Sequence, residues 1–374
     1  MPATFFQSWW FQNLLTLGLL TGAALLAWRL SRREYWRNAF HEICRNRLAV
    51  ISFIILCGYG AIAILDSVGW RRPLRHPETG EVARHPETGK VILDQGASAL
   101  DYLLAPISAK REKTYSAPLA ATDYTPTTAM SSTGQPQRVH APLTYPRSHL
   151  FGTDRIGQDV FCQACKSIRT GIIIGLLTTI LAVPFALVFG TAAGYYGGWI
   201  DDATQYVCAV LSSIPTVLFI AAFMIIFGQG LPQLCLAMGI ASWTGLYRLL
   251  RGETLRLRDA DFVQAATATG VPVWRILSRH IVPNLLHIVL ITTVLRFSSE
   301  VLAEAALTYL GIGVGADTMS WGSMINDART ELTRDPVIWW KLTTAFAFMI
   351  GLVLPANIFA DAVRDALDPR LRTQ

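Results

Sequence analysis

The chain has 374 residues, of which 52% are hydrophobic and 16% are charged, and its mean hydropathy is +0.37. This composition excludes an ordinary soluble domain and predicts an all-α protein that crosses the membrane several times. The net charge of +6 does not indicate nucleic-acid binding, because the basic residues lie at the ends of apolar segments and in one long loop, without interleaved aromatic side chains.

The first apolar segment runs from about Trp9 to Trp28 and is close to the ~20 residues that a spanning helix needs. Arginines follow this segment instead of preceding it, which argues against a cleaved signal peptide and favours an uncleaved anchor with its N-terminus outside. A helix lying in the interface is the alternative, because Gln7 and Gln12 weaken the span. Residues 1–44 are therefore expected to hold an extra helix and a basic cytoplasmic segment, ahead of a first core span at 45–66.

A hydrophilic insertion, residues 67–169, comes next. It holds a nine-residue repeat, RHPETGEVA at Arg75 and RHPETGKVI at Arg84, whose Pro-Glu-Thr-Gly turns predict a pair of hairpins. Repeat expansion explains His76 and His85 better than metal binding does. The stretch Ser116–Pro146 has a loop-like composition, and we expect it to be ordered only against a partner.

Two motifs at the end of the insertion resemble metal sites but lack the required spacing. Asp154 and Asp159 have neither the ligand spacing nor the terminal Glu of an EF-hand. Cys162 and Cys165 form a CxxC without a second pair or a histidine cluster, so we predict no metal site here. We expect both cysteines to lie on a helix, and a disulfide is the alternative.

Five further spans are expected within residues 170–374. Gly171 with Gly175, and Gly190 with Gly194, form small-xxx-small pairs that permit close helix contact, while Pro184 allows a bend without requiring one. The expected spans are Gly171–Tyr196, about Tyr206–Phe227, Leu231–Leu250, Pro283 to about Leu310, and Leu342–Ala360.

Orientation follows from the arginine-rich short loops. The segments Arg29–Arg47, Arg248–Arg279 and Arg364–Arg372 fall on one side of the membrane under this span count, which sets them and the C-terminus in the cytoplasm. The long insertion and the segment Leu310–Lys341 are then expected outside.

A polar, arginine-bearing segment, residues 259–284, separates two of the spans. Asp259 and Asp261 suit the start of a short helix, and Gly270 breaks it before Pro272. The pattern predicts two short helices that meet at a glycine elbow, the second running from Pro272 to His280 before Pro283 opens the next apolar run. Pattern alone leaves two interpretations open: an amphipathic interfacial loop, or an element gripped by a partner on the water side.

Three charged residues lie within a predicted span. Arg296, Glu300 and Glu304 are spaced i, i+4, i+8, so on a helix they fall within about 80° of one another and their charges can pair. Lining of a pathway and a structural ion pair both remain open, and a proton-driven transporter would use such a set as a relay. The chain contains no GxxxxGK[ST], HExxH or GxSxG motif, so we expect no ATP hydrolysis by this chain.

The polar segment resembles the EAA loop of ABC importer permeases, which docks into the ATPase subunit. The resemblance is carried by Gln264, Ala265 and Ala266, then Gly270, then Pro283. Gln264 stands where the family usually has Glu, and Val282 where it often has Leu. The resemblance implies that Asp261, Phe262, Gln264, Ala265, Ala266, Gly270 and Pro283 couple this chain to the ATPase.

Further fragments in this order resemble the C-type permease subunit of dipeptide/oligopeptide ABC importers. They are RNRLAV at Arg45, FGTDRIGQDVF at Phe151, GYYGGWID at Gly194, SSIPT at Ser212, EAALTYLGIGV at Glu304, SWGSMI at Ser320 and ADAVRDALDPRLR at Ala360. The implied fold is the type I ABC importer permease fold, with six core transmembrane helices, an extra N-terminal helix and a large extracytoplasmic loop.

The same resemblance implies the partners. These are a homologous B-type permease, two cytoplasmic ABC ATPases, an extracytoplasmic substrate-binding protein and a peptide substrate, in a bacterial inner membrane. ATP would be used by the ATPases, and no cofactor is expected on this chain. The alternative function is a proton- or ion-coupled secondary transporter that uses Arg296, Glu300 and Glu304.

Overall fold

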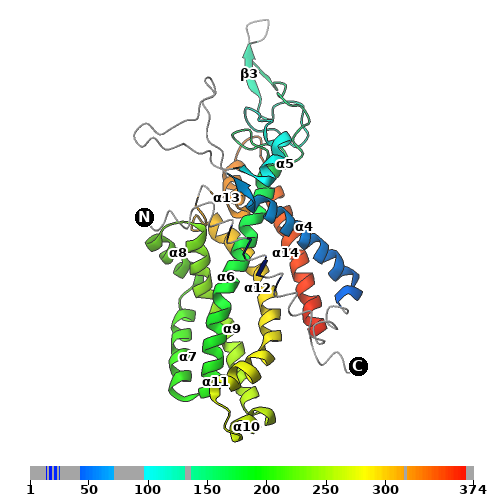
Figure 1. Ribbon diagram of the computed structural model, residues 1–374. Coiled ribbons are helices and arrows are strands. Elements are labelled where there is room, and N and C mark those ends of the chain that lie inside the picture. The colour runs from blue at the N-terminus through cyan, green and yellow to red at the C-terminus, as the bar shows by residue number, and fades with distance from the viewer. Residues whose placement is uncertain are drawn as a thin grey trace, which may run out of the picture. The chain divides into compact units, whose positions relative to one another are not determined.

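The computed structural model describes residues 14, 17, 18, 21, 22, 25, 43–70, 97–130, 136–315 and 318–367. The predicted span Trp9–Trp28 lies mostly outside these residues, and the repeat at Arg75 and Arg84, with His76 and His85, lies wholly outside them. The described chain is dominated by helices, with short strands in the insertion (Figure 1).

The chain divides into two compact units. The insertion unit comprises Met1–Ala27, Cys57–Ile172 and Met319–Ile350. The helical unit comprises Trp28–Leu56, Ile173–Thr318 and Gly351–Gln374.

Among its described residues, the insertion unit contains two small antiparallel sheets and two capped helices. Strand β1 (Gly69–Trp70) pairs with β2 (Ala97–Ser98), and β3 (Thr127–Met130) pairs with β4 (Pro136–Val139). Helix α5 (Ala99–Ser108) begins at a capping box in which Ser98 Oγ accepts the Asp101 amide at 3.1 Å and the Asp101 carboxylate accepts the Ser98 amide at 2.9 Å. Helix α13 (Trp321–Glu331) begins at a similar pairing of Ser320 with Ser323.

Buried side chains of the insertion unit form hydrogen bonds with other segments of the same unit. Trp340 is 1% exposed and donates to the carbonyl of Thr153 at 2.9 Å. The carboxylate of Glu112 accepts the amides of Thr144 and Tyr145 at 3.0 and 2.7 Å. Much of the stretch Ser116–Pro146, expected to be ordered only against a partner, is thus held by hydrogen bonds within this chain, which its loop-like composition did not reveal.

The helical unit is built from long helices joined by short turns. Its elements are α4 (Arg47–Ser67), α6 (Val160–Tyr196), α7 (Gly198–Ser213), α8 (Thr216–Phe227), α9 (Leu231–Arg258), α10 (Asp261–Ala268), α11 (Val273–Ile276), η1 (Leu277–Ile281), α12 (Val282–Tyr309) and α14 (Trp340–Leu367), of which α4, α6 and α14 also contribute residues to the insertion unit. Cys162 and Cys165 lie near the start of α6, on a helix as predicted, and both are free thiols.

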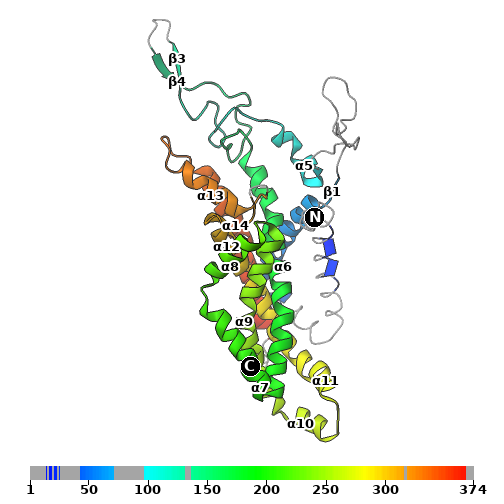
Figure 2. The same cartoon turned by 90° about the vertical axis from the view of Figure 1, so that its left-hand side faces the viewer.

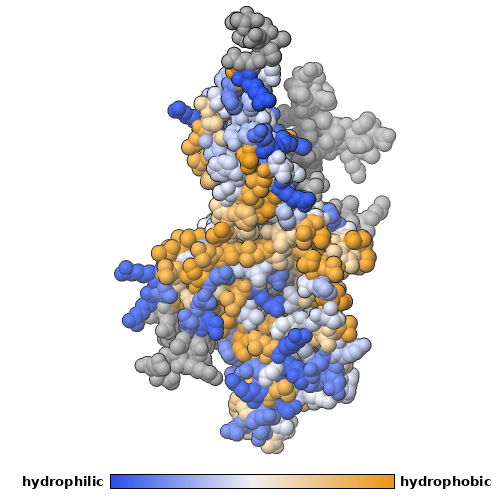
Figure 3. All heavy atoms as spheres, turned by 180° about the vertical axis from the view of Figure 1, so that it is seen from behind, coloured by the Kyte–Doolittle hydropathy of each residue, from blue (hydrophilic) through white to orange (hydrophobic). Residues whose placement is uncertain are grey.

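Four described helices are long and apolar enough to cross a membrane, and a fifth span is added if α7 and α8 count as one. Apolar side chains cover broad areas of the surface, as lipid-facing helices require (Figure 3). Helix α9 holds the remaining expected core span, Leu231–Leu250; many of its side chains are buried against other helices, so they need not be strongly apolar.

The predicted span Tyr206–Phe227 is not one straight helix. Helices α7 and α8 meet at an angle of 87°, visible as a sharp turn of the chain in Figure 2. Pro215 lacks an amide hydrogen and forces Ile214 into an extended conformation, with φ −87° and ψ 126°, so the helix cannot continue through it.

Candidate coupling loop and translocation cavity

The polar segment forms a helix with a well-defined end. Helix α10 ends at Ala268, and Gly270, which has φ +76°, follows its C-cap residue. The amides of Gly270 and Val271 donate to the carbonyls of Thr267 and Ala266 at 3.0 and 3.1 Å. This pair of bonds is a Schellman motif, in which a residue with positive φ closes the helix. The predicted glycine elbow is therefore present, and its geometry explains why glycine occupies it.

One face of the loop is buried in the helical unit and the other is exposed. Val263, Ile276 and Ile281 are at most 1% exposed and belong to one apolar cluster with α9 and α12. Phe262 is 44% exposed and Trp274 is 65% exposed. Figure 1 shows α10 and α11 together at one end of the helices.

The residues predicted from the resemblance divide between these faces. Asp261, Gln264 and Ala265 are exposed beside Phe262, whereas Ala266 is 9% exposed and packs into the apolar cluster. The structure thus places Ala266 behind the exposed surface. A helix with 3.6 residues per turn turns Val263 and Ala266, three apart, toward the same side.

Gln264 makes a contact that a glutamate cannot make. Its side-chain amide donates to the carbonyl of Asp259 at 3.1 Å, which links α10 to the end of α9. A carboxylate has no hydrogen to donate at neutral pH. Asp261, in the first turn of α10, makes no side-chain hydrogen bond or ion pair within the described residues, so its charge is free for a partner.

The second arm of the loop differs from the prediction. The helix that begins at Val273 does not stop at His280 but continues through the π-turn η1 into α12. Pro283 lies in the first turn of α12, where its missing amide hydrogen cannot donate to the i−4 carbonyl, and the π-turn just before it has a different hydrogen-bond spacing that accommodates the proline. The second arm and the following span therefore form one continuous element, Val273–Tyr309.

A clamp holds α7 against α9 just ahead of the loop. The guanidinium of Arg251 donates two bonds, of 2.5 and 2.6 Å, to the carboxylate of Asp201. The hydroxyls of Thr204 and Tyr247 lie 2.9 Å apart on the same two helices. Bidentate pairing fixes geometry as well as charge, so α7 and the last turns of α9 form one block.

A cavity of about 440 Å³ lies between α8, α9 and α12 of the helical unit. Arg296 and Glu300 line it from α12, and Ser242 and Gly245 line it from α9. The Arg296 guanidinium donates to the carbonyl of Ser242. A Cβ at Gly245 would lie 2.9 Å from Arg296 Nη2, so a glycine at this position leaves room for the guanidinium.

The predicted charged set is brought together only in part. Arg296 and Glu300 share the cavity, but within the described residues they form no ion pair; Arg296 is engaged by α9 instead. Glu304 is 1% exposed and accepts the hydroxyl of Thr308 at 2.8 Å. Ser242 and Gly245 were missed from the sequence, because no local pattern shows that α9 faces Arg296.

A family model described as the binding-protein-dependent transport system inner membrane component matches residues 186–373. The matched region includes the loop, the clamp and the cavity described above. The chain belongs to this family. The part of the insertion that precedes α6, including helix α5, lies outside the residues that the family model matches.

Three relatives of this chain are named as oligopeptide or dipeptide permeases. The oligopeptide transport system permease protein OppC of Bacillus subtilis is 34% identical over 60% of this chain and 73% of its own length. The dipeptide permease DppC of the same organism is 32% identical over 60% of this chain and 69% of its own length. DppC of Alkalihalophilus pseudofirmus is 28% identical over 90% of this chain and 91% of its own length.

Proposed function

We propose that this inner membrane component is the C-type permease subunit of an ATP-driven peptide importer. The observation that carries the proposal is the two-sided coupling loop. Phe262 and Trp274 face outward, while Val263 and Ile276 pack into the same cluster as α9 and α12, the helices that line the cavity. A displacement of the exposed face of the loop is therefore transmitted to α9 and α12 through packed side chains.

The proposed partners follow from this arrangement and from the family. Two cytoplasmic ATPases bind and hydrolyse ATP and contact the loop, and a homologous B-type permease completes the pathway. An extracytoplasmic binding protein delivers the peptide. This chain carries no cofactor, lies in a bacterial inner membrane and has a cytoplasmic C-terminus.

The proposed mechanism is alternating access. Closure of the ATPases displaces α10, and the Arg251 to Asp201 clamp carries the displacement to α7 as well as α9. Rigid blocks joined at a few flexible positions switch between discrete arrangements instead of deforming continuously. Gly270 and the 87° bend at Pro215 are two positions at which the chain of this unit changes direction between helices, and we assign the hinge movement to them.

The test is uptake by the reconstituted complex. Proteoliposomes that hold both permeases and both ATPases are expected to accumulate a labelled oligopeptide when loaded binding protein and ATP are supplied. Phe262→Ala with Trp274→Ala should abolish binding-protein-stimulated ATP hydrolysis. Trp199→Ala, which removes a 78% exposed indole from α7 outside the loop, is the matched control.

One result would favour the alternative class of transporter. If uptake continues after ATP depletion while a proton gradient is maintained, the chain acts as a secondary transporter through Arg296 and Glu300, and the proposal is wrong.

A further inference from the structure

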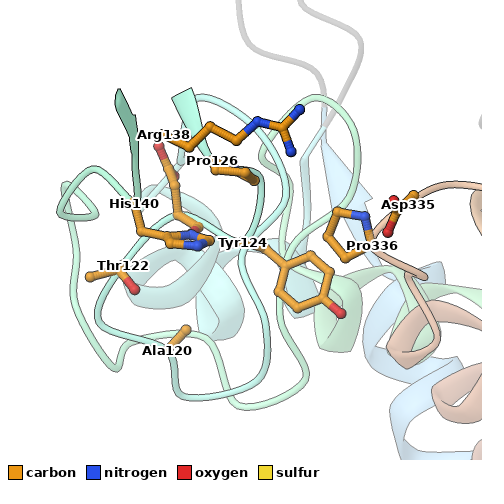
Figure 4. A pocket seen from close by; sticks show the side chains of 9 residues that line it. Ala120, Thr122, Tyr124, Pro126, Arg138, His140, Asp335 and Pro336 are labelled. Carbon is orange, nitrogen blue, oxygen red and sulfur yellow. The ribbon is translucent and has the colours of Figure 1, made fainter. Parts of the chain in front are cut away.

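A second cavity, of about 510 Å³, lies in the insertion unit beside the β3–β4 hairpin. Its walls come from the strand-flanking loops and from the loop that follows α13. Figure 4 shows Arg138 extending from β4 toward the side on which Asp335 and Pro336 lie, with Tyr124 between these groups and His140. The cavity is open to solvent on one side, and its volume is that of a hollow that could seat a small organic ligand.

Hydrogen bonds fix the floor of this cavity. Tyr124 donates its hydroxyl hydrogen to the carbonyl of Val337 at 3.0 Å, and its ring meets Trp340 edge-on at 4.8 Å. His140 Nδ1 lies 2.8 Å from the carbonyl of Asp123, and the Asp123 amide donates to Ala141 at 2.7 Å. The aromatic floor is therefore held in place before any ligand arrives.

Two charged side chains that line the cavity take no part in this hydrogen-bond network. Arg138 and Asp335 carry opposite charges, and within the described residues neither side chain makes a hydrogen bond or an ion pair. The ring of Tyr124 and the pyrrolidines of Pro126 and Pro336 provide apolar surface in the same cavity. Both charged side chains are exposed to solvent where the cavity opens, so two charges of opposite sign are accessible to a ligand that is itself dipolar.

We propose that this cavity binds short peptides through their free termini. Arg138 takes the terminal carboxylate, for which a planar guanidinium offers two parallel hydrogen bonds, and Asp335 takes the terminal ammonium. The Tyr124 and proline surface receives the apolar part of the peptide. A purely anionic or purely cationic ligand would leave one of the two charges without a partner. The inference goes beyond the proposed transport function, because it gives the permease a binding site of its own outside the cavity lined by Arg296.

The experiment uses the full-length chain in lipid nanodiscs, without ATPases or binding protein, and measures heat of binding by titration. The probes are trialanine, its N-acetyl derivative and its C-terminal amide. Trialanine is expected to bind, and each cap should weaken binding about tenfold to hundredfold, the typical effect of losing one charge-assisted bond. Arg138→Gln should weaken trialanine binding by the same factor as the C-terminal amide does, and should leave the affinity for the amide unchanged. Asp335→Asn should weaken trialanine binding by the same factor as N-acetylation does, and should leave the affinity for the acetylated peptide unchanged.

Two control variants distinguish this cavity from the rest of the protein surface and from the cavity lined by Arg296. Arg111→Gln removes an exposed arginine of the same unit that does not line the cavity, and it should leave affinity unchanged. Arg296→Gln tests the other cavity. The proposal is overturned if trialanine does not bind, if capped and free peptides bind alike, or if Arg296→Gln abolishes binding while Arg138→Gln does not. The last outcome would leave the transport proposal intact.

Discussion

Gly270 illustrates how a single residue shapes the coupling loop. Its φ of +76° lies in the left-handed region, and a Cβ built there would meet no heavy atom within 4 Å. The residue type at this position is therefore constrained by the backbone conformation and not by the space available for a side chain.

Replacing Gly270 by alanine should cost about 1 kcal/mol of loop stability, because an L-residue is strained at this φ. We expect binding-protein-stimulated ATP hydrolysis of the assembled complex to fall while basal hydrolysis is unchanged. Gly252→Ala is the matched control, since Gly252 lies inside α9 with open space around its Cβ position. Equal coupling in both variants would show that the elbow does not transmit movement.

Glu331 is a second residue whose surroundings determine its behaviour. It is 4% exposed and accepts the hydroxyl of Tyr115 at 3.3 Å. Burial raises the pKa of Glu331 above its ordinary value, and the positive charge of Lys341 offsets this only in part. Burial, with the nearby Glu331 charge, likewise raises the pKa of Tyr115 to about 12.

The raised pKa of Glu331 predicts a pH dependence. The folded protein holds this proton more tightly than the unfolded chain, so the stabilisation is complete below the ordinary pKa of 4.5 and is lost as pH rises through the folded value. Glu331→Gln should remove this component. Hydrogen exchange of α13, compared between wild type and variant at matched pH, should show wild-type protection falling relative to the variant above pH 4.5. Parallel trends would contradict the prediction.

At the scale of elements, two glycines set the distance between α6 and α9. A Cβ at Gly190 would lie 3.0 Å from Leu250 Cβ, and one at Gly194 would lie 2.7 Å from the carbonyl oxygen of Arg251. The close contact predicted from the Gly190 and Gly194 spacing is confirmed, and the structure identifies α9 as the partner helix.

Gly194→Ala should be destabilising by about 1 to 3 kcal/mol, because the new methyl group meets backbone that cannot move aside. Thermal unfolding in detergent should therefore occur at lower temperature. Gly58→Ala in α4, where no atom lies within 4 Å, is expected to leave the unfolding temperature unchanged. A similar loss in both variants would mean that alanine is poorly tolerated in these helices generally.

At the scale of the helical unit, the loop and the cavity are separate sites joined by one apolar cluster. Phe262 lies on the exposed face of the loop and Arg296 lies in the cavity, while Val263, Leu246 and Leu285 lie in the cluster between α10, α9 and α12. Variants at the two ends should therefore give different defects.

Arg296→Gln is expected to lower peptide uptake about tenfold, because it removes a charged group from the cavity wall. ATPase assembly with the permeases should persist, as measured by co-purification. Phe262→Ala should instead weaken assembly, with uptake falling in proportion to the ATPase lost. If Arg296→Gln also releases the ATPases, the two sites are not separable in the way the structure indicates.

The sequence alone was enough to predict the membrane class and most of the helices, from the apolar runs and the distribution of arginines. Gly270 and Pro272 located the loop. These features depend on local composition and backbone conformation. Other features depended on contacts between segments far apart in the chain. Only the tertiary structure showed that Ala266 faces the core, that Arg296 turns to α9 instead of pairing with Glu300, and that Pro215 breaks a span while Pro184 and Pro283 do not. The angle at a proline and the partner of a buried charge are set by the neighbouring helices, which no local window of sequence contains.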